Sequence, residues 1–557
     1  MLGSSSMLGL VLAILVLTTD PSIAQLVERP LITGRHGMVT SLHPLSSLAG
    51  LKILMKGGNA FDAAVATAVA TTVVDPKNST IGGQGFATIY AAKTGEVRAL
   101  NFFGPSPKAA TIDAFKGKDY TRGYLSCPVP SNLKGYQVIL ETYGTMSWEQ
   151  VLEPAIELAQ NGFVVTQEFT QLLEEQRDEL NRYPETARVF FKNGVAPRPG
   201  EIFIQADLAR TLREVAKKGP DVFYKGEIAR QVDEFFNAHG GLLSYGDLAS
   251  YEAQWVEPIS TSYRGYTIYT QPPNSSAIAM LMQLNILEGY DVTSYHHNSA
   301  EYLHLVAEVM RLALADRNQY VADPEFVSIP VSSLLSKEYA GKRRQLIDLR
   351  KTIPVVRPGE PMSERERDHT THLTVVDRDG NMVALTQTLG AWYGSGVVVG
   401  NTGVIFSNQM RHLHLDPKSP SLVGPGRRPR SNQSPTIVLK DGRPFMAIGT
   451  PGGDGIWQRL TQVMVNILDF KMDIQTAISK PRIILGGFQE TGTEIRPVLD
   501  VEERIPPDVR RELSTRGFII NIIADDEGRV NGIIKDPKTG FLLGGADPRS
   551  ETYAIGW

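Results

Sequence analysis

The sequence predicts a large α+β protein in which helices and strands are unevenly distributed along the chain. Helix-like spacing of apolar residues dominates before about residue 340, whereas residues 370–450 are rich in β-branched residues, glycine and turn residues. The chain has 557 residues and a hydrophobic content of 42%, so it can bury an extensive core. This length predicts several domains unless one large layered unit contains most of the chain.

The charge balance excludes one class of partner. The 56 basic and 60 acidic side chains give a formal charge of -4, without the basic excess that nucleic-acid binding requires. We therefore expect no nucleic-acid partner. The single cysteine, Cys127, cannot form an internal disulfide and has no metal-ligand pattern beside it, so we expect it to be an ordinary residue.

The N-terminus has the layout of a secretory signal peptide. An apolar run from Met7 to Leu17 is followed by the small-residue site Ser22-Ile23-Ala24 before Gln25. The run is too short to cross a bilayer core of about 30 Å. We expect residues 1–24 to be removed and the protein to be secreted or periplasmic. The residues before the run include no Lys or Arg, which leaves a misassigned start or an anchor as alternatives. No later segment predicts a membrane span.

The predicted helices lie in the first half of the chain. Residues 44–72 predict two closely packed helices with many small residues, separated by Gly57-Gly58-Asn59. Residues 259–270 have the composition of a strand, and the charged, proline-bearing residues 350–369 predict an exposed loop. Four further segments predict amphipathic helices: 148–160, 205–217, 227–238, and 299–318 with its His304, Glu308, Arg311 and Asp316.

A β-hairpin is predicted where the strand-rich part begins. Two strand-like segments, 370–376 and 382–388, flank Arg378-Asp379-Gly380, with glycine where a left-handed residue is required. A register symmetric about the turn places Thr370 opposite Thr388. Facing Cβ atoms lie about 4.5–5.5 Å apart, so the two hydroxyl groups would be within hydrogen-bonding reach. Such a pair also occurs in ordinary sheets, and the hairpin alone therefore supports catalysis weakly.

Motifs around and beyond this hairpin resemble a known family. Thr370-Thr371-His372 opens the first strand, Asp377 and Gly380-Asn381 form its turn, and further motifs occur before and after it along nearly the whole chain after residue 24. These motifs include Gly57 to Ala64, Gly82 to Phe86, Pro272 to Ser276, Ala315 to Arg317, Ser407 to Met410, Ser434 to Thr436, Pro451 to Gly453 and Ala546 to Arg549. Together they closely resemble the γ-glutamyltransferase family of N-terminal-nucleophile hydrolases.

The resemblance implies a four-layer αββα sandwich and a precursor that cuts itself. The cut would fall between His369 and Thr370, giving a large subunit of residues 25–369 and a small subunit of residues 370–557. The two fragments would form a heterodimer. The hydroxyl of Thr370 would attack the His369 carbonyl, and hydrolysis of the resulting ester would release a free α-amine.

The resemblance also assigns catalytic roles. Thr370 would be the nucleophile, with Thr388 orienting its hydroxyl. An α-amine, with a pKa of about 7.7–8.0, is a suitable base for that hydroxyl. Gly452 and Gly453 match the oxyanion-hole pair, whose backbone N–H groups stabilise the tetrahedral intermediate. This chemistry requires no cofactor and no metal, and we expect neither, although His412-Leu413-His414 has alternate histidines that a strand would point the same way.

The residues expected to hold a glutamyl head group differ from the family pattern. Arginine is replaced by Phe103, asparagine by Gly390, and aspartate within Arg411-His412. These changes remove a partner for a carboxylate and an acceptor for an ammonium group. The substrate-binding candidates fall into three groups. Gln409 and Ser431 are retained from the family pattern, and Arg430 is a neighbouring cation. The replaced positions are Phe103, Gly390, His412 and Asn432.

These departures predict a self-processing threonine amidohydrolase or acyltransferase with a different acyl specificity. The resemblance offers precedents in family relatives that hydrolyse glutaryl-type side chains or oxamate, so glutaryl-like or oxamate-like amides are the expected small-molecule substrates. Arg411, His412 and Arg430 would offer positive charge to a carboxylate on such a substrate. A surface role for those cations is equally compatible with the sequence. The alternative function is a genuine γ-glutamyltransferase or glutathione hydrolase, and a third is an unprocessed, inactive binding protein.

Overall fold

The computed structural model describes residues 29–358, 369–486, 495–526 and 528–557. The predicted signal peptide, residues 1–24, and the second half of the predicted loop before Thr370 lie outside these ranges. The described chain forms two antiparallel sheets packed face to face between two layers of helices. The expected four-layer αββα sandwich is therefore confirmed.

The first sheet has the predicted hairpin at its centre. Its strand order is β19-β2-β10-β11-β3-β4-β7, so both hairpin strands are paired on each side. The strands of this sheet are β2 Gly37–Ser41, β3 Gln84–Ala91, β4 Glu96–Phe102, β7 Gln254–Val256, β10 His369–Asp377, β11 Met382–Gly390 and β19 Tyr553–Gly556.

The second sheet packs against the first through a small apolar core. Its strand order is β1-β18-β17-β13-β12-β9-β8. Met38 and Val376 from the first sheet meet Ile437, Ala447 and Ile533 from the second in this core. The strands of the second sheet are β1 Ile32–Gly34, β8 Ile259–Tyr263, β9 Tyr266–Thr270, β12 Thr436–Lys440, β13 Arg443–Gly449, β17 Asn531–Lys535 and β18 Leu542–Ala546.

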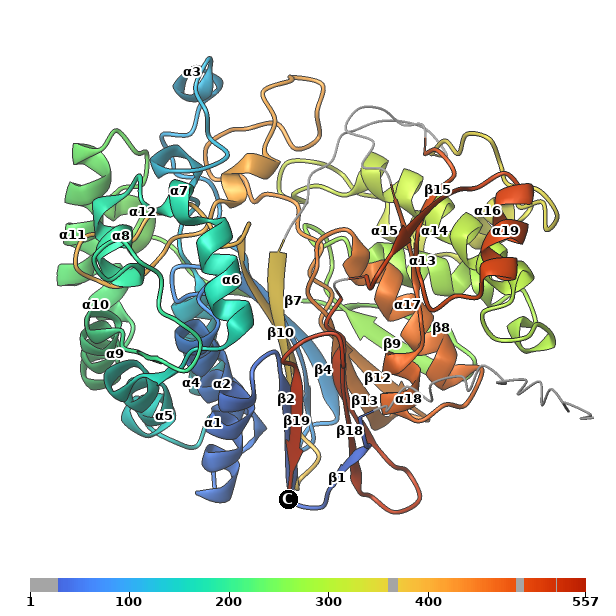
Figure 1. The fold of residues 1–557 in the computed structure, drawn as a ribbon, viewed down its shortest axis with the longest axis horizontal. Coiled ribbons are helices and arrows are strands. Elements are labelled where there is room, and N and C mark those ends of the chain that lie inside the picture. The colour runs from blue at the N-terminus through green and yellow to red at the C-terminus, as the bar shows by residue number, and fades with distance from the viewer. Residues whose placement is uncertain (1–28, 359–368, 487–494, 527) are drawn as a thin grey trace, which may run out of the picture.

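Helices of the N-terminal half cover the outer face of the first sheet and extend beyond it. They lie on the left in Figure 1. Their bounds are α1 Pro44–Met55, α2 Ala60–Val74, α3 Ile112–Phe115, α4 Asn132–Tyr143, α5 Trp148–Asn161, α6 Gln167–Glu175, α7 Arg177–Leu180, α8 Pro184–Phe190, α9 Ala206–Lys218, α10 Asp221–Tyr224, α11 Glu227–Ala238 and α12 Tyr245–Ala249. The short strands β5 Phe163–Val164 and β6 Ile202–Phe203 pair among them.

A second group of helices covers the outer face of the second sheet, on the right in Figure 1. It is joined by a small sheet of β14 Ile483–Leu485, β15 Val498–Glu502 and β16 Ile519–Ile523. The helices are α13 Ile278–Leu287, α14 Ala300–Tyr320, α15 Val331–Leu334, α16 Lys337–Arg344, α17 Gly455–Leu468, α18 Ile474–Ser479 and α19 Pro507–Thr515. Short 3₁₀ helices span Tyr124–Ser126, Val292–Ser294 and Gln409–His412.

The two predicted helices between residues 44 and 72 are confirmed as α1 and α2. Asn59 caps α2 in a reciprocal capping box with Asp62, which explains why the helix restarts there. The two helices can approach closely because Gly50 has no side chain. A Cβ at this position would lie only 2.1 Å from Thr67 Oγ1. The N–H of Ala60 donates to Asp377 Oδ2 at 2.9 Å, so the start of α2 is attached to the hairpin turn.

Two predictions are confirmed in position but differ in detail. The predicted strand 259–270 is a hairpin, because Arg264 and Gly265 adopt positive φ angles and reverse the chain between β8 and β9. Helix α14 is present, but its polar residues are buried and paired rather than solvated. Glu308 and Arg311 form an ion pair at 2.7 Å, and Asp316 pairs with Arg343 at 3.0 Å.

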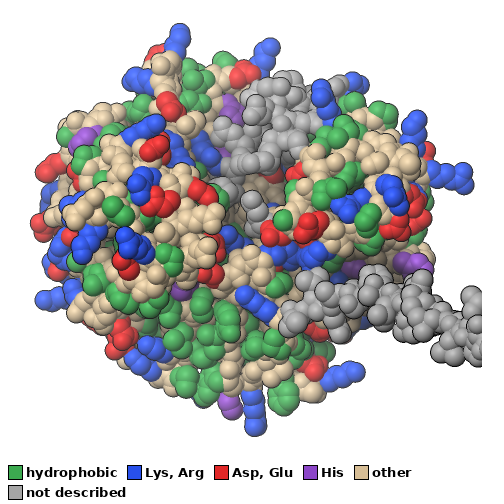
Figure 2. Space-filling view, in the orientation of Figure 1, with side chains coloured by type: hydrophobic (Ala, Val, Ile, Leu, Met, Phe, Trp, Pro, Cys, Tyr) green, Lys and Arg blue, Asp and Glu red, His purple; other side chains and the backbone are tan. Residues whose placement is uncertain are grey.

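No helix in the described ranges is long and apolar enough to span a membrane. Basic and acidic side chains are interspersed over the face shown in Figure 2, as the balanced composition suggests. Cys127 is buried, and burial raises the pKa of its thiol to about 12. It is therefore a thiol of low reactivity, as expected from its sequence context.

His372 joins the two sheets. Its ring lies between the hydroxyl groups of Thr386, 2.8 Å from Nδ1, and Thr374, 3.0 Å from Nε2. A Cβ on Gly449 of β13 would lie 2.2 Å from this ring, so the glycine allows the second sheet to pack directly on it. Complete burial lowers the pKa of His372 to about 3.

We predict that His372 makes the protein less stable in acid. Because its pKa falls from 6.5 in the unfolded chain to about 3 in the fold, the unfolded chain takes up the proton first. The stabilisation is complete above pH 6.5 and is lost as the pH falls toward 3, with a slope of up to about 1.4 kcal/mol per pH unit. Urea unfolding of His372→Gln should show a shallower slope between pH 6.5 and 4, although the variant is less stable at neutral pH.

The matched control is His239→Gln, which removes an exposed histidine directly after α11. An unchanged slope in His372→Gln would contradict the assignment of this pH dependence to His372.

Candidate active site

The predicted pairing of Thr370 with Thr388 is confirmed. Strands β10 and β11 pair from Thr370 opposite Thr388 to Val376 opposite Met382, in the symmetric register expected from the turn. Gly380 has a φ of 88°, and Asp377 accepts hydrogen bonds from the N–H groups of Asp379 and Asn381 at 3.0 Å each. The turn thereby fixes the register that brings the two threonines together.

The hydroxyl of Thr388 is oriented toward Thr370. The Thr370 hydroxyl donates to Thr388 Oγ1 at 3.4 Å, and the N–H of Gly390 donates to the same oxygen at 2.9 Å. The first distance exceeds the usual 2.7–2.8 Å for hydroxyl pairs. Long catalytic hydrogen bonds are common in unliganded sites and shorten when the substrate binds.

The hairpin ladder is irregular at one place, next to Thr370. His369 pairs with Gly390 and Thr370 with Thr388, so Leu389 is an extra residue in β11. Its N–H donates to the carbonyl of Asn78, and its carbonyl accepts from the N–H of Asn408. The bulge therefore coincides with the predicted scissile bond, as bulges often do beside active sites.

The predicted oxyanion loop follows β13 and precedes α17. Gly452 and Gly453 have φ angles of 108° and 56°, which glycine adopts readily. Within the described ranges, neither N–H donates a hydrogen bond to another group of the protein. Two adjacent N–H groups that are not engaged at the N-terminal end of a helix form a suitable site for a negatively charged oxygen.

One cavity brings the predicted nucleophile and the predicted oxyanion donors together. It has a volume of about 580 Å³ and includes Thr370, Gly452 and Gly453 in its lining. One wall comes from α6, and the other comes from the small sheet and the loop before β17. The lining also includes Asn78, Glu168, Trp392, Arg459, Asp526 and Arg529.

An ion pair crosses between the two walls. Glu168 of α6 accepts a hydrogen bond from Arg529 at 3.0 Å and lies 3.5 Å from Lys77 Nζ. Lys77 also pairs with Asp75 at 3.0 Å. These residues come from both predicted subunits, so the cavity is closed on this side by contacts between segments far apart in the sequence.

The predicted substrate-binding residues lie outside the lining of this cavity. Phe103 is fully buried and stacks on Phe86 at 5.2 Å between ring centroids. Because Gly85 pairs with Phe102, Phe103 lies beside Gln84, which pairs with Thr388 in turn. It therefore occupies the same row of side chains as the two threonines, but its ring offers no hydrogen bond to a carboxylate.

The other candidates lie at the end of β11 or in segments that follow it in the sequence. Gly390 has a φ of 96°, and a Cβ there would lie 2.3 Å from Asn408 Oδ1, so the asparagine of the family pattern does not fit. Gln409 and Ser431 are fully buried. Asn432 accepts a hydrogen bond from Arg317, which also pairs with Asp454 at 2.7 Å, directly after Gly453.

Positive charge gathers in the loops after β11. Burial, with the charges of Arg430 and His412, lowers the pKa of His414 to about 4. Burial also lowers the pKa of Arg122, and Arg411 contributes through its charge. Arg430 and His412 are therefore close enough to His414 to influence its pKa, and Arg411 is close enough to Arg122 to influence that of Arg122. The described residues include no group of three His, Cys, Asp or Glu side chains that could hold a metal.

The sequence did not predict most of the cavity wall. Asn78, Glu168 and Arg529 belong to none of the motifs that we used, and Arg459 lies on α17 without a recognisable pattern. The one motif that pointed to this part of the structure was Asp547-Pro548-Arg549. Asp547 pairs with Arg482, and Arg549 pairs with Glu502.

Comparisons of the sequence and of the structure with known proteins agree with one another. A family model described as gamma-glutamyltranspeptidase matches residues 46–557. The glutathione hydrolase proenzyme of Escherichia coli (strain K12) is 36% identical over 540 residues, 93% of this chain and 91% of that protein. The acylase ACY 1 proenzyme of Pseudomonas sp. (strain SE83) is 37% identical and covers 94% of each chain. The crystal structure of cephalosporin acylase from Bacillus halodurans has a TM-score of 0.88 at 34% identity, with 97% of this chain and 99% of that chain covered.

We predict that removing the Thr388 hydroxyl slows cleavage before Thr370. Thr388→Val preserves the shape of the side chain but removes the oxygen that both Thr370 and Gly390 use. Loss of such a hydrogen bond costs about 1–3 kcal/mol, so cleavage should slow about tenfold or more. The measurement is the time course of fragment appearance on a denaturing gel after cell-free synthesis.

Thr371→Val is the matched control, because the Thr371 hydroxyl is buried and has no hydrogen-bond partner among the described residues. It should cleave at the wild-type rate. Equal rates for Thr388→Val and the wild type would contradict the proposed contact.

Proposed function

The chain belongs to the gamma-glutamyltranspeptidase family, and on this premise we propose that Thr370 is its nucleophile and that it removes carboxylate-bearing acyl groups, of glutaryl or oxamate type, from amides. It is an N-terminal-nucleophile amidohydrolase of this family. The main observation in support of the proposed nucleophile is the cavity shared by Thr370, Gly452 and Gly453.

In the proposed maturation step, Thr370 Oγ1 attacks the carbonyl carbon of His369. The peptide C–N bond breaks, the acyl group moves to the oxygen, and the nitrogen of Thr370 becomes a free amine. Water then hydrolyses the ester and leaves a carboxylate on His369. The irregular pairing at this bond supports the proposal, because the extra residue Leu389 in β11 interrupts the regular ladder there. Residues 25–369 and 370–557 would remain together as two subunits, since both sheets contain strands from both segments.

In the proposed turnover, the Thr370 amine takes the proton from its own hydroxyl. Oγ1 attacks the substrate amide, and the N–H groups of Gly452 and Gly453 bind the oxyanion that forms. The leaving amine takes the proton and departs, and water or an acceptor amine then releases the acyl group. The neighbouring His372 is an unsuitable base, because its pKa of about 3 and its two hydroxyl partners keep it neutral and enclosed.

Two observations support the acyl specificity. Phe103 fills the position where the family pattern has an arginine, and its stacked, buried ring cannot bind a carboxylate. Arg411, His412 and Arg430 belong to the segments that follow β11, and Arg430 and His412 are close enough to His414 to influence its pKa. A carboxylate at the far end of the acyl chain would be held by these cations, while an α-ammonium group would be repelled.

The alternative is hydrolysis or transfer of a γ-glutamyl group. Gln409 and Ser431 are retained from the family pattern and are buried near Gly390 and Arg317. A relative named glutathione hydrolase proenzyme is 36% identical to this chain. These residues would have to hold the head group without the arginine and the aspartate.

We predict a clear order of substrates. Glutaryl and oxamate amides should be hydrolysed with a kcat/KM at least tenfold above that of γ-glutamyl p-nitroanilide, because the ammonium group has lost its acceptor. Initial rates of anilide release measure this order, and Thr370→Ala should turn over none of them. Efficient γ-glutamyl transfer to glycylglycine would instead establish the alternative function.

Arg430→Ala tests the carboxylate contact within the same experiment. It should raise KM for anionic acyl amides about tenfold, as expected for the loss of one charge-assisted contact. Arg427→Ala is its matched control in the same loop, because Arg427 packs over the Phe326 ring. An unchanged KM in Arg430→Ala for every anionic substrate would exclude Arg430 from binding.

A further inference from the structure

Arg459 holds the loop that carries the two proposed oxyanion donors. One nitrogen of its guanidinium, Nη1, donates to the carbonyl of Gly452 at 2.8 Å and to the carbonyl of Pro451 at 3.2 Å. Arg459 is 5% exposed and comes from the second turn of α17, directly after the loop. A single side chain thus contacts two consecutive peptide groups.

Because peptide groups are planar, the contacts of Arg459 with the two carbonyls also affect the N–H groups of Gly452 and Gly453. The carbonyl of Pro451 and the N–H of Gly452 belong to one planar peptide group, and the carbonyl of Gly452 and the N–H of Gly453 belong to the next. In a trans peptide the C=O and N–H bonds point in opposite directions. Fixing both carbonyls against Arg459 therefore also fixes the directions of both N–H bonds, which point away from the guanidinium.

The fold makes specific space for this guanidinium. A Cβ on Gly452 or Gly455 would lie 2.5 Å from Arg459 side-chain atoms, and a Cβ on Gly528 would lie 2.2 Å from its Nε. Three glycines from two separate segments therefore allow the charged group to lie against the backbone. At Gly452 the φ of 108° independently favours glycine.

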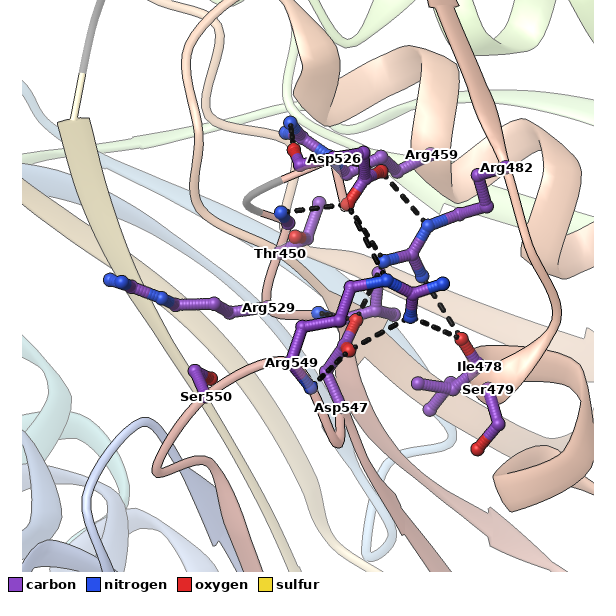
Figure 3. A network of polar contacts seen from close by, with 12 residues as sticks. Thr450, Arg459, Ile478, Ser479, Arg482, Asp526, Arg529, Asp547, Arg549 and Ser550 are labelled. Carbon is purple, nitrogen blue, oxygen red and sulfur yellow. Dashed lines mark hydrogen bonds and ion pairs between the residues drawn. The ribbon is translucent and has the colours of Figure 1, made fainter. Parts of the chain in front are cut away.

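Asp526 fixes Arg459 from the other side. Its Oδ2 accepts from Nε at 2.9 Å, and its carbonyl accepts from Nη2 at 2.6 Å. Asp526 is itself held by two hydrogen bonds from Arg482, at 2.9 and 3.0 Å. Figure 3 shows Arg459, Asp526 and Arg482 converging, with Asp547 and Arg549 completing the buried network. The guanidinium therefore has little freedom to turn away.

We propose that Arg459 is a positioning residue that aims the Gly452 and Gly453 N–H groups at the oxyanion formed during amide cleavage. Its charge next to the two carbonyls also polarises both peptide groups and makes their N–H groups stronger donors. The contribution is realised when negative charge develops on the substrate oxygen, so it acts on the transition state more than on the bound substrate. This inference rests on the proposed oxyanion role of the two glycines.

The test compares Arg459→Lys and Arg459→Gln with the wild type on glutaryl p-nitroanilide, or on γ-glutamyl p-nitroanilide if that is the anilide turned over. Lysine retains the charge but cannot bind both carbonyls and Asp526 at the same time. We expect kcat to fall at least tenfold in Arg459→Lys and further in Arg459→Gln, within the 10²–10³-fold range known for a lost oxyanion donor. KM should stay within about twofold, because substrate binding does not depend on the oxyanion.

A transition-state mimic separates positioning from general structural damage. The tetrahedral adduct of 4-boronobutanoate should bind more weakly in each variant by about the same factor as kcat/KM falls, while binding of the product glutarate stays unchanged. Gly528→Ala provides a second variant if Arg459 cannot be replaced, because its Cβ would displace the guanidinium without removing it. It should show the same pattern.

Arg504→Lys is the control at the outer end of the network, where Arg504 contacts Glu502 and the Ser479 carbonyl. It should retain the wild-type kcat. Wild-type kcat in folded Arg459→Gln, or an equal loss of affinity for glutarate and for the boronate, would overturn the proposal. Failure of the proposed function itself would appear differently, as retained turnover in Thr370→Ala.

Discussion

The pairing of β10 with β11 is the constraint on which the candidate site depends. This hairpin lies in the middle of a buried sheet, and its turn fixes a register that places Thr370 opposite Thr388. The same register directs alternate side chains toward the second sheet, where the His372 ring meets Gly449 at the end of β13. Because Gly452 follows Gly449 by three residues, the nucleophile and the oxyanion loop are held together by the packing of the two sheets.

Two separate sets of ion-paired side chains lie near this hairpin, and they have different roles. Behind the loop, Arg459, Asp526 and Arg482 form a buried network in which each charge has several partners, so the cost of removing them from water is offset by ion pairs and hydrogen bonds. In front of it, the Glu168–Arg529 contact joins segments from both predicted subunits. The buried network fixes the direction of the backbone groups in the oxyanion loop, whereas the Glu168–Arg529 contact closes one side of the cavity.

The sequence was sufficient where the determinants are local. Glycine at residue 380 and the alternation around it specified the hairpin and the facing threonines, and the glycines before α17 marked the loop. It was insufficient where distant segments meet: Arg459 and Asp526 become neighbours only after β13, α17 and the segment after β16 have packed. The burial of Glu308 and Arg311 was missed for the same reason, because helical spacing does not reveal a charged partner inside the core. For Phe103, the sequence indicated a changed contact, and the structure supplied its buried, stacked environment.

The central claim is that Thr370 becomes the N-terminal residue of a mature subunit inside an already folded sandwich. Intact mass spectrometry of the purified wild-type protein, combined with N-terminal sequencing, tests this most directly. We expect two fragments that co-purify, the smaller one beginning at Thr370. A single uncut chain, or a smaller fragment that begins at any residue other than Thr370, would contradict it.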